Sequence, residues 1–332
     1  MSGHPADEAR ARERGRGRRA RSPEYIPWQG WKDILIRTYL EFNRHRLLAL
    51  AAGVAFYDLL AIFPAITALV SIYGFFASAT EIEGDLAPLM NLVPAEVLDV
   101  IREQIHRIAS QGAESLSLTL IGAVLFSLWS ANAGMKALFD ALNVIYDEVE
   151  KRSFVRLNIA SLLFTAALIA VALLNTAAMV VITPVIAQLQ INKLTAGALS
   201  IFKWIFLLLA VVLVLSALYR FGPSRRPAKW RWLSIGSVVG ALSWLTGSAA
   251  FSWYLAHFAK YGVTYGSLGA AIGLMMWLWV TAIAILLGGQ LNAEIEHQTA
   301  RDSTIGDMER PLGRRGATMA DTVGEAQAGD AA

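Results

Sequence analysis

Residues 265–290 form an unbroken stretch without a charged side chain. An α-helix rises about 1.5 Å per residue, so this stretch is long enough to cross the hydrocarbon core of a bilayer, which is roughly 30 Å thick. Five similar stretches come earlier in the chain, at about residues 47–77, 116–133, 157–184, 198–219 and 232–257. Because lipid offers no partners to open backbone groups, each stretch is predicted to be helical. The sequence therefore predicts an all-α membrane bundle of six transmembrane helices.

Two further segments have the pattern of amphipathic helices that do not span the membrane. Residues 94–110 start with a proline and two acids, as helices often do, and repeat apolar side chains at helical spacing, at Val97, Ile101, Ile105 and Ile108. Residues 134–148 carry an apolar stripe of Met135, Leu138, Leu142 and Ile145 and a polar stripe of Lys136, Asp140, Asn143 and Asp147. We expect the first helix to lie on the outer face, in the interface or over the bundle. The second is predicted to be a cytoplasmic extension of the second span.

Lys and Arg side chains are concentrated in alternate loops. The first cluster, before the first stretch, is Lys32, Arg37, Arg44 and Arg46. The second, between the second and third stretches, is Lys151, Arg152 and Arg156. The third, between the fourth and fifth stretches, is Arg220, Arg225, Arg226, Lys229 and Arg231. Loops with such clusters stay on the cytoplasmic side of a membrane. We therefore expect both termini to be cytoplasmic, with the loops 78–115 and 258–264 outside.

The two ends of the chain differ in composition from residues 28–297, which we interpret as the transmembrane domain. Residues 1–27 contain seven arginines between positions 9 and 21, and residues 298–332 have few large apolar side chains. Both ends are predicted to be disordered cytoplasmic tails. An arginine run is compatible with nucleic-acid binding, but beside a membrane the simpler interpretation is attraction to anionic lipid. We expect lipids as partners, and no specific nucleic acid.

The last two spans carry faces of small residues. Gly236, Gly240, Ser243 and Gly247 share one face of the fifth span, and the sixth span has Gly266, Gly269 and Gly273. Small residues let helix backbones approach closely in lipid, where no hydrophobic drive exists between helices. The sequence favours packing of these two faces against each other, and it leaves open a sliding surface between two conformations.

A few polar residues interrupt the apolar stretches. Asp58 lies six residues before Pro64 in the first span, and Asn132 and Asn175 lie near or within later spans. A carboxylate within a membrane is costly and usually faces the bundle interior or a wet cavity, and a proline can kink the helix beside it. These four residues are the candidate substrate-binding site. The alternatives are a structural ion pair between Asp58 and a loop arginine, and interhelical hydrogen bonds from the two asparagines.

The sequence lacks the motifs of the common enzyme classes. It has no cysteine, its five histidines are scattered, and it contains no HExxH, no GxxxxGK[ST] and no GxSxG. We therefore expect neither an enzyme, nor a cofactor, nor a metal site.

Three blocks in order resemble the YihY/virulence factor BrkB family of bacterial inner-membrane proteins. They are AGVAFYDLLAIFPAITALVSIYG at 52–74, LWSANAGMKALFDALNVIYDEVEKRSF at 128–154, and a third block from 219 to 297 that begins YRFGPSRRPAKWRW. The resemblance implies six spans in the bacterial cytoplasmic membrane. The family has carried a ribonuclease BN label, for which this sequence contains no motif. Relatives often have a small or hydroxyl residue where this chain has Asp58.

The sequence leaves two classes of function open. The first is a permease-like protein that moves or flips an amphipathic solute or lipid, a hypothesis that rests on Asp58, the small-residue faces and the outer amphipathic helix. The alternative is a membrane scaffold that docks a partner without transporting anything. A hydrolytic enzyme is the least favoured of the three hypotheses, because its motifs are missing.

Overall fold

The computed structural model describes residues 5–73, 116–168, 170–171, 193–258, 268–306 and 308–327. Within these residues all regular structure is helical, apart from a single isolated bridge between Ala228 and Thr304. The prediction of an all-α fold is confirmed. The predicted helix 94–110, the third predicted span beyond residue 171, Asn175 and Gly266 lie outside the described residues.

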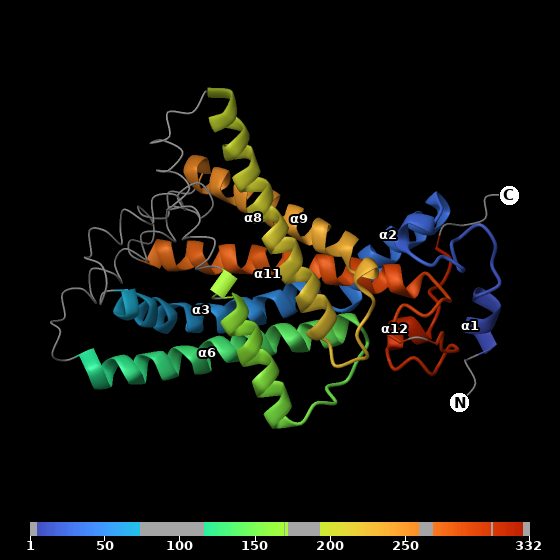
Figure 1. The fold of residues 1–332 in the computed structure, drawn as a ribbon, viewed down its shortest axis with the longest axis horizontal. Coiled ribbons are helices and arrows are strands. Elements are labelled where there is room, and N and C mark those ends of the chain that lie inside the picture. Colours follow the sequence, from blue (N-terminus) through green and yellow to red (C-terminus); the bar gives the residue numbers. More distant parts are fainter. Residues whose placement is uncertain are drawn as a thin grey trace.

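Five long helices form the body of the described part of the molecule (Figure 1). They are α3 (Leu47–Tyr73), α6 (Leu116–Ile145), α8 (Lys193–Phe221), α9 (Ser234–Phe258) and α11 (Leu268–His297). A further apolar helix, Phe154–Leu168, follows α6. The shorter elements are α1 (Pro5–Arg10), η1 (Pro23–Tyr25), α2 (Trp28–Arg44), η4 (Trp230–Trp232) and α12 (Thr318–Asp321).

Two described helices are long and apolar enough to cross a membrane by length and composition alone. These segments are Ser234–His257 in α9 and Ala271–His297 in α11. Three shorter apolar helical segments accompany them, at Leu47–Ala61, Phe154–Leu168 and Leu208–Phe221. The structure thus supports a helical protein with apolar membrane helices, while the number of six spans remains a prediction.

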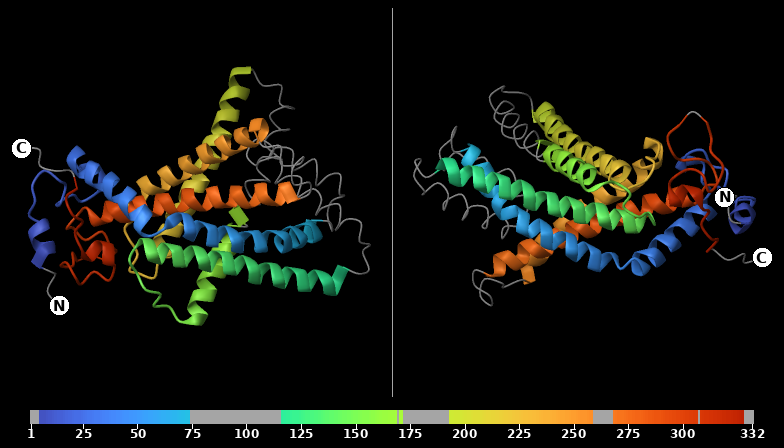
Figure 2. Two further views of the ribbon diagram at one scale, coloured as in Figure 1. Left: turned by 180° about the vertical axis from the view of Figure 1, so that it is seen from behind. Right: turned by 90° about the horizontal axis from the view of Figure 1, so that it is seen from below.

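Helix α11 is the centre of the bundle. It lies between α9 and α3, with α6 packed along α3 and α8 along α9 (Figure 2). The buried core draws Leu47 and Val54 from α3, Phe139 from α6, Tyr219 from α8 and Leu286 from α11. Both α1 and α12 lie at one end of this bundle, beyond the start of α3 and the end of α11.

The predicted amphipathic extension at 134–148 is the end of α6, which runs without a break to Ile145. All four residues of its predicted apolar stripe are buried in the core. Asp140 is exposed as expected, but Asn143 is buried. Its side-chain oxygen accepts the backbone N–H of Ser224 at 2.7 Å, so a residue expected on the polar face joins α6 to the loop between α8 and α9.

The small-residue face of α9 packs against α11, but further along α11 than the sequence predicted. The backbone of Gly236 meets Gly288, Gly240 lies beside Ala284 and Gly288, and Gly247 meets Val280. The described partner surface is Val280, Ala284 and Gly288, which differs from the predicted face at Gly269 and Gly273. Gly269 and Gly273 are buried elsewhere on α11, and Ser243 is half-buried. Because α9 and α11 are antiparallel, the start of α9 lies beside the end of α11.

The terminal segments also differ from their predicted disorder, because both are packed over the end of α11. Arg18, Thr299, Ser303 and Arg315 are each at most 2% exposed. The backbone N–H of Ala300 donates to the carbonyl oxygen of Arg18 at 2.8 Å, which joins the two segments directly. Few large apolar residues are present, so the packing is carried by hydrogen bonds and ion pairs that composition does not reveal.

The contact between α9 and α11 predicts a steric test with two glycines. A Cβ at Gly288 would lie 2.5 Å from both the carbonyl oxygen of Gly236 and the hydroxyl of Tyr219, whereas a Cβ at Gly53 would meet nothing within 4 Å. We expect Gly288→Ala to cost about 1–3 kcal/mol, as overpacking does. Gly53→Ala should be neutral or stabilise by up to about 1 kcal/mol through helix propensity. Thermal unfolding in detergent measures both, and equal melting temperatures would contradict the close contact.

Candidate functional site

The structure places Asp58 against α6. Its side chain lies directly on Gly134, where any larger residue would collide with the carboxylate. Val54, one turn earlier, is buried, whereas Phe56 and Leu60 are about half exposed, at 53% and 51%. Asp58 therefore points toward a neighbouring helix, on the α6 side of α3. Pro64 lies within the continuous helical backbone of α3.

Asn132 faces a different neighbour. Its amide nitrogen donates to the side-chain oxygen of Asn158 at 2.9 Å, and its oxygen accepts from the hydroxyl of Ser161. Lys136 Nζ donates to the same Asn158 oxygen at 3.2 Å. These bonds are of the interhelical kind, between α6 and the helix Phe154–Leu168. Asp58 and Asn132 thus lie on different contacts of α6, and the four candidate residues do not form one described cluster.

The densest group of buried polar side chains lies instead at the end of α11. Gln290, Asn292, Glu294, Glu296 and Gln298 are each at most 1% exposed. At helical spacing Gln290, Glu294 and Gln298 share one side, and Asn292 and Glu296 share the opposite side. Leu291, Ala293 and Ile295 between them are buried in apolar contacts. Polar residues at every second position from 290 to 298 are the signal in the sequence for this group.

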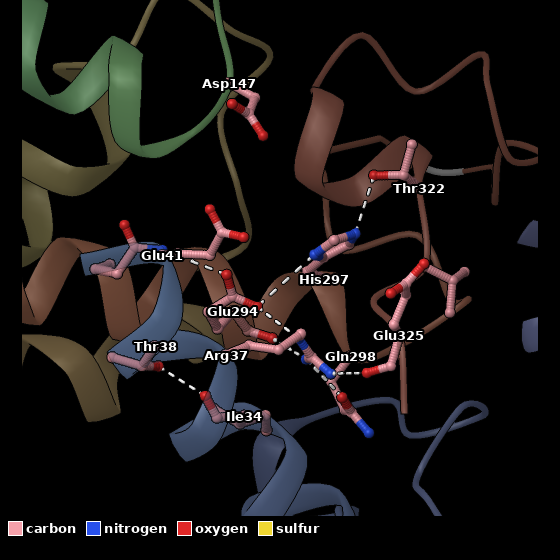
Figure 3. A network of polar contacts seen from close by, with 12 residues as sticks. Ile34, Arg37, Thr38, Glu41, Asp147, Glu294, His297, Gln298, Thr322 and Glu325 are labelled. Carbon is pink, nitrogen blue, oxygen red and sulfur yellow. Dashed lines mark hydrogen bonds and ion pairs between the residues drawn. The ribbon is translucent and has the colours of Figure 1, made fainter. Parts of the chain in front are cut away.

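One side of this group meets α2. Arg37 Nε donates to Glu294 at 2.7 Å, and its Nη2 donates to the side chain of Gln298 at 2.7 Å (Figure 3). The third guanidinium nitrogen donates to the backbone oxygen of Glu325 at 2.8 Å. His297 lies 3.7 Å from the Glu294 carboxylate. A single guanidinium thereby joins α2, α11 and the C-terminal segment.

The opposite side meets the loop between α8 and α9. Arg225 makes two hydrogen bonds to the carboxylate of Glu296, at 2.7 and 2.9 Å, and both side chains are fully buried. The guanidinium carbon lies 4.1 Å from the ring centroid of Tyr146, and Ser303 Oγ donates to Glu296 at 2.9 Å. Burial lowers the pKa of Arg225, but the charge and hydrogen bonds of Glu296 outweigh it and raise that pKa, so the guanidinium stays charged.

Asn292 anchors the start of α9 to the same place. Its side-chain oxygen accepts the backbone N–H of Gly236 at 2.9 Å, and its amide nitrogen donates to the carbonyl oxygen of Leu233 at 3.1 Å. The first N–H groups of a helix have no partner within the helix. Asn292 supplies a hydrogen-bond partner for one of these N–H groups, and it can approach because Gly236 has no side chain.

His45 connects this group to the loops at the start of α3 and the end of α6. Its Nδ1 lies 3.0 Å from Gln290, and its Nε2 lies 3.5 Å from Glu41 and 3.7 Å from Asp147. Burial lowers the pKa of His45, but contacts with Asp147 and Gln290 outweigh it and raise that pKa, while the nearby His45 ring lowers the pKa of Asp147. The pair therefore stabilises the fold fully between about pH 4 and 6.5. Above this range the stabilisation is lost as His45 loses its proton, and below it as Asp147 takes one up.

The chemistry of this polar group is that of a junction. Its acids are compensated by arginines, and the described residues include no set of three His, Asp or Glu side chains placed to hold a metal ion. Its side chains join the end of α11 to α2, the turn at His45, the loop between α8 and α9, the start of α9 and the two terminal segments. We refer to it below as the α11 polar junction.

Long apolar helices, two of them long enough to cross a membrane, with a polar junction at one end are the architecture of a helical bundle suited to a membrane. The chain belongs to the Virulence factor BrkB family, whose sequence profile matches residues 38–311. The predicted resemblance to this family is confirmed. No solved structure matches the chain.

Individual relatives agree with the family. A relative in Bacillus subtilis, YfkH, is 29% identical over 79% of this chain and 94% of its own length, and its name describes it as ribonuclease-like. A UPF0761 membrane protein of Aggregatibacter aphrophilus is 24% identical over 79% of this chain and 92% of its own. Another UPF0761 membrane protein, from Pseudoalteromonas atlantica, is 24% identical over 83% of this chain and 91% of its own.

The α11 polar junction predicts a large difference between two glutamates. Removing one partner of a buried pair leaves an uncompensated charge and costs about 3–5 kcal/mol. Glu296→Gln should therefore strongly lower the melting temperature in detergent. Glu309 pairs with Arg301 at 2.7 Å, but both side chains are exposed, so Glu309→Gln should cost less than about 1 kcal/mol. Similar losses in the two variants would argue against a special role for Glu296.

Proposed function

We propose that this protein is a permease-like protein of the bacterial inner membrane that moves or flips an amphipathic solute or lipid. In this proposal the chain crosses the membrane six times, with both termini in the cytoplasm. The membrane names of the relatives and the apolar helices support the location. The alternation of Lys and Arg along the sequence supports the orientation.

The lengths of the remaining helices support further spans. Helices α3, α6 and α8 have 27, 30 and 29 residues. At about 1.5 Å per residue each exceeds the roughly 30 Å core of a bilayer. Large apolar side chains are exposed along them, at Phe56, Leu60, Phe126, Ile205, Phe206, Leu209 and Leu213. Such surfaces are costly in water and suit contact with lipid.

The observation that carries the transport proposal is the carboxylate of Asp58 within the apolar helix α3. Ionisable residues within membrane helices usually mark substrate or ion pathways. Asp58 lies on Gly134, so this contact is narrow, and a small relative movement of α3 and α6 would change access to the carboxylate. We propose that this α3–α6 contact, with Asp58 as its polar group, recognises the polar end of an amphipathic substrate.

Anionic lipid is the proposed partner at the cytoplasmic end. Residues 12–27 line an open hollow of about 750 Å³, and five of its lining residues are arginines, namely Arg12, Arg14, Arg18, Arg19 and Arg21. Arg18 is paired with Glu13, while Arg12, Arg14, Arg19 and Arg21 are exposed. A concentration of exposed guanidinium groups beside a bilayer attracts acidic headgroups.

The proposed orientation predicts which introduced cysteines react from outside. The chain has no native cysteine, so each label reports a single position. A cysteine replacing Ser78, in the first predicted outer loop, should react with an impermeant thiol reagent in intact cells. A cysteine replacing Ala326, which is exposed in the C-terminal segment, should react only after the cells are opened. The reverse pattern would invert the topology.

The transport proposal predicts a specific loss in Asp58→Asn. The substitution keeps the shape of the side chain and removes its charge. If Asp58 serves transport, the variant should therefore fold normally but lose its transport activity. In vesicles with fluorescently labelled phosphatidylglycerol, dithionite quenching should reach both leaflets with the wild-type protein. With Asp58→Asn, lipid movement should be at least about tenfold slower, equivalent to about 1.4 kcal/mol of barrier.

The control is Asp140→Asn, which makes the same chemical change at an exposed position of α6. It should move lipid as the wild type does. A lower melting temperature for Asp58→Asn with unchanged lipid movement would assign Asp58 a structural role. Wild-type vesicles in which only the outer leaflet is quenched would reject lipid flipping and favour the scaffold alternative.

A further inference from the structure

Helix α2 has its polar and apolar faces reversed relative to a helix on a water-soluble surface. Two of its five charged residues, Asp33 and Arg37, are buried, at 0% and 5% exposure. Its exposed surface carries five large apolar side chains, Trp28, Leu35, Ile36, Tyr39 and Leu40, which are exposed by 40–70%. A helix in water normally turns its apolar stripe to the core and its charges outward.

The buried polar face is held firmly by partners within the protein. Arg16 donates to the Asp33 carboxylate at 2.8 and 2.9 Å, and the backbone N–H of Gln327 donates to it at 2.8 Å. Arg37 is bound to Glu294 and Gln298 of the α11 polar junction. Rotating α2 to bury its apolar face would break all of these bonds. The exposure of the apolar face is therefore fixed by the structure.

The turn between α2 and α3 changes the direction of the chain, so the axis of α2 is inclined to that of α3. Helix α2 ends at Arg44, and Arg46 adopts a left-handed backbone conformation, with φ of 50°, immediately before α3 starts at Leu47. The two helices are inclined to each other in all views (Figures 1 and 2). If α3 crosses the bilayer, α2 departs at its cytoplasmic end, where the polar headgroups lie.

The charge of the exposed surface is one-sided. Lys32, Arg44 and Arg46 are exposed, while the acids of the same segment are turned inward, with Asp33 fully buried and Glu41 partly buried. The apolar strip also continues along the chain into exposed Leu48 and Phe56 of α3. Arg44 pairs with Glu41 at 3.0 Å, so Lys32 and Arg46 carry the excess positive charge. An apolar face flanked mainly by cations is the pattern of helices that lie in the plane of an anionic membrane surface.

We propose that α2 lies in the cytoplasmic interface of the bilayer, with its apolar face among the acyl chains and its cations at anionic headgroups. It is an in-plane helix that positions the α11 polar junction at the membrane surface. Its apolar side chains would lie about 5–10 Å below the headgroup boundary. The proposal rests on the membrane location and orientation proposed above, and it holds whether or not the protein transports a substrate.

The test uses the absence of native cysteine. Single cysteines replacing Ile36 or Tyr39 are labelled with a nitroxide in full-length protein reconstituted into vesicles of phosphatidylglycerol and phosphatidylethanolamine. Electron paramagnetic resonance then measures collision with oxygen, which concentrates in lipid, and with a nickel chelate, which stays in water. Phe56→Cys in α3 is the control for lipid contact, and Met308→Cys, at a position that is 84% exposed in the C-terminal segment, is the control for water.

Both α2 labels should collide with oxygen at least several times more often than with the nickel chelate, giving a depth between those of the two controls. Nickel accessibility equal to that of Met308→Cys would place α2 in water and overturn the proposal. Protection from both reagents would show a protein partner on this face and would also overturn it. Because the readout does not depend on lipid movement, failed flipping with lipid-exposed α2 labels would reject only the transport proposal.

Discussion

The buried ion pair between Arg225 and Glu296 is the interaction on which the organisation of this end of the molecule depends. Burying two charges is costly, and only complete hydrogen bonding with a close opposite charge offsets the cost. Glu296 obtains two bonds from Arg225 and one from Ser303, and thereby fixes the loop between α8 and α9 and the start of the C-terminal segment. On the other side of α11, Glu294 fixes α2 through Arg37 in the same way. The end of α11 is consequently the point around which segments distant in sequence are assembled.

Two different physical rules therefore act along α11. In its apolar part, helices associate through close backbone approach, and Gly236 and Gly288 meet because neither has a side chain. At its polar end, charge compensation takes over, and Asn292 supplies the hydrogen bonds that hold α9 in the register this glycine contact requires. The change from one rule to the other coincides with the proposed boundary between lipid and cytoplasm. The proposed in-plane placement of α2 fits that boundary, because its charged face belongs to the junction and its apolar face does not.

Much of the fold followed from the sequence, since long uncharged stretches leave helices as the only choice and the stripe beginning at Met135 identified the buried side of α6. Three features could not be predicted. The register of α9 on α11 depends on how two antiparallel helices align, so Gly288 was missed as the partner of Gly236. The terminal segments have too few apolar residues to predict order, and their packing depends on partners such as Arg18 that are distant in sequence. The third feature is the contact between Asp58 and Gly134. A carboxylate in an apolar stretch is conspicuous in the sequence, but a single glycine such as Gly134 gives no sign that it lies against one.

The α11 polar junction orders both terminal segments of the chain, and hydrogen–deuterium exchange of the full-length protein in lipid nanodiscs measures that order. In the structure, the backbone N–H of Ala300 donates to Arg18 at 2.8 Å, and that of Arg226 donates to Gly316 at 2.9 Å. We expect peptides covering these amides to exchange at least about a hundredfold more slowly than the unfolded chain, as amides in cooperatively ordered structure do. Exchange at the rate of the unfolded chain would show that the terminal segments are disordered and that the junction does not organise them.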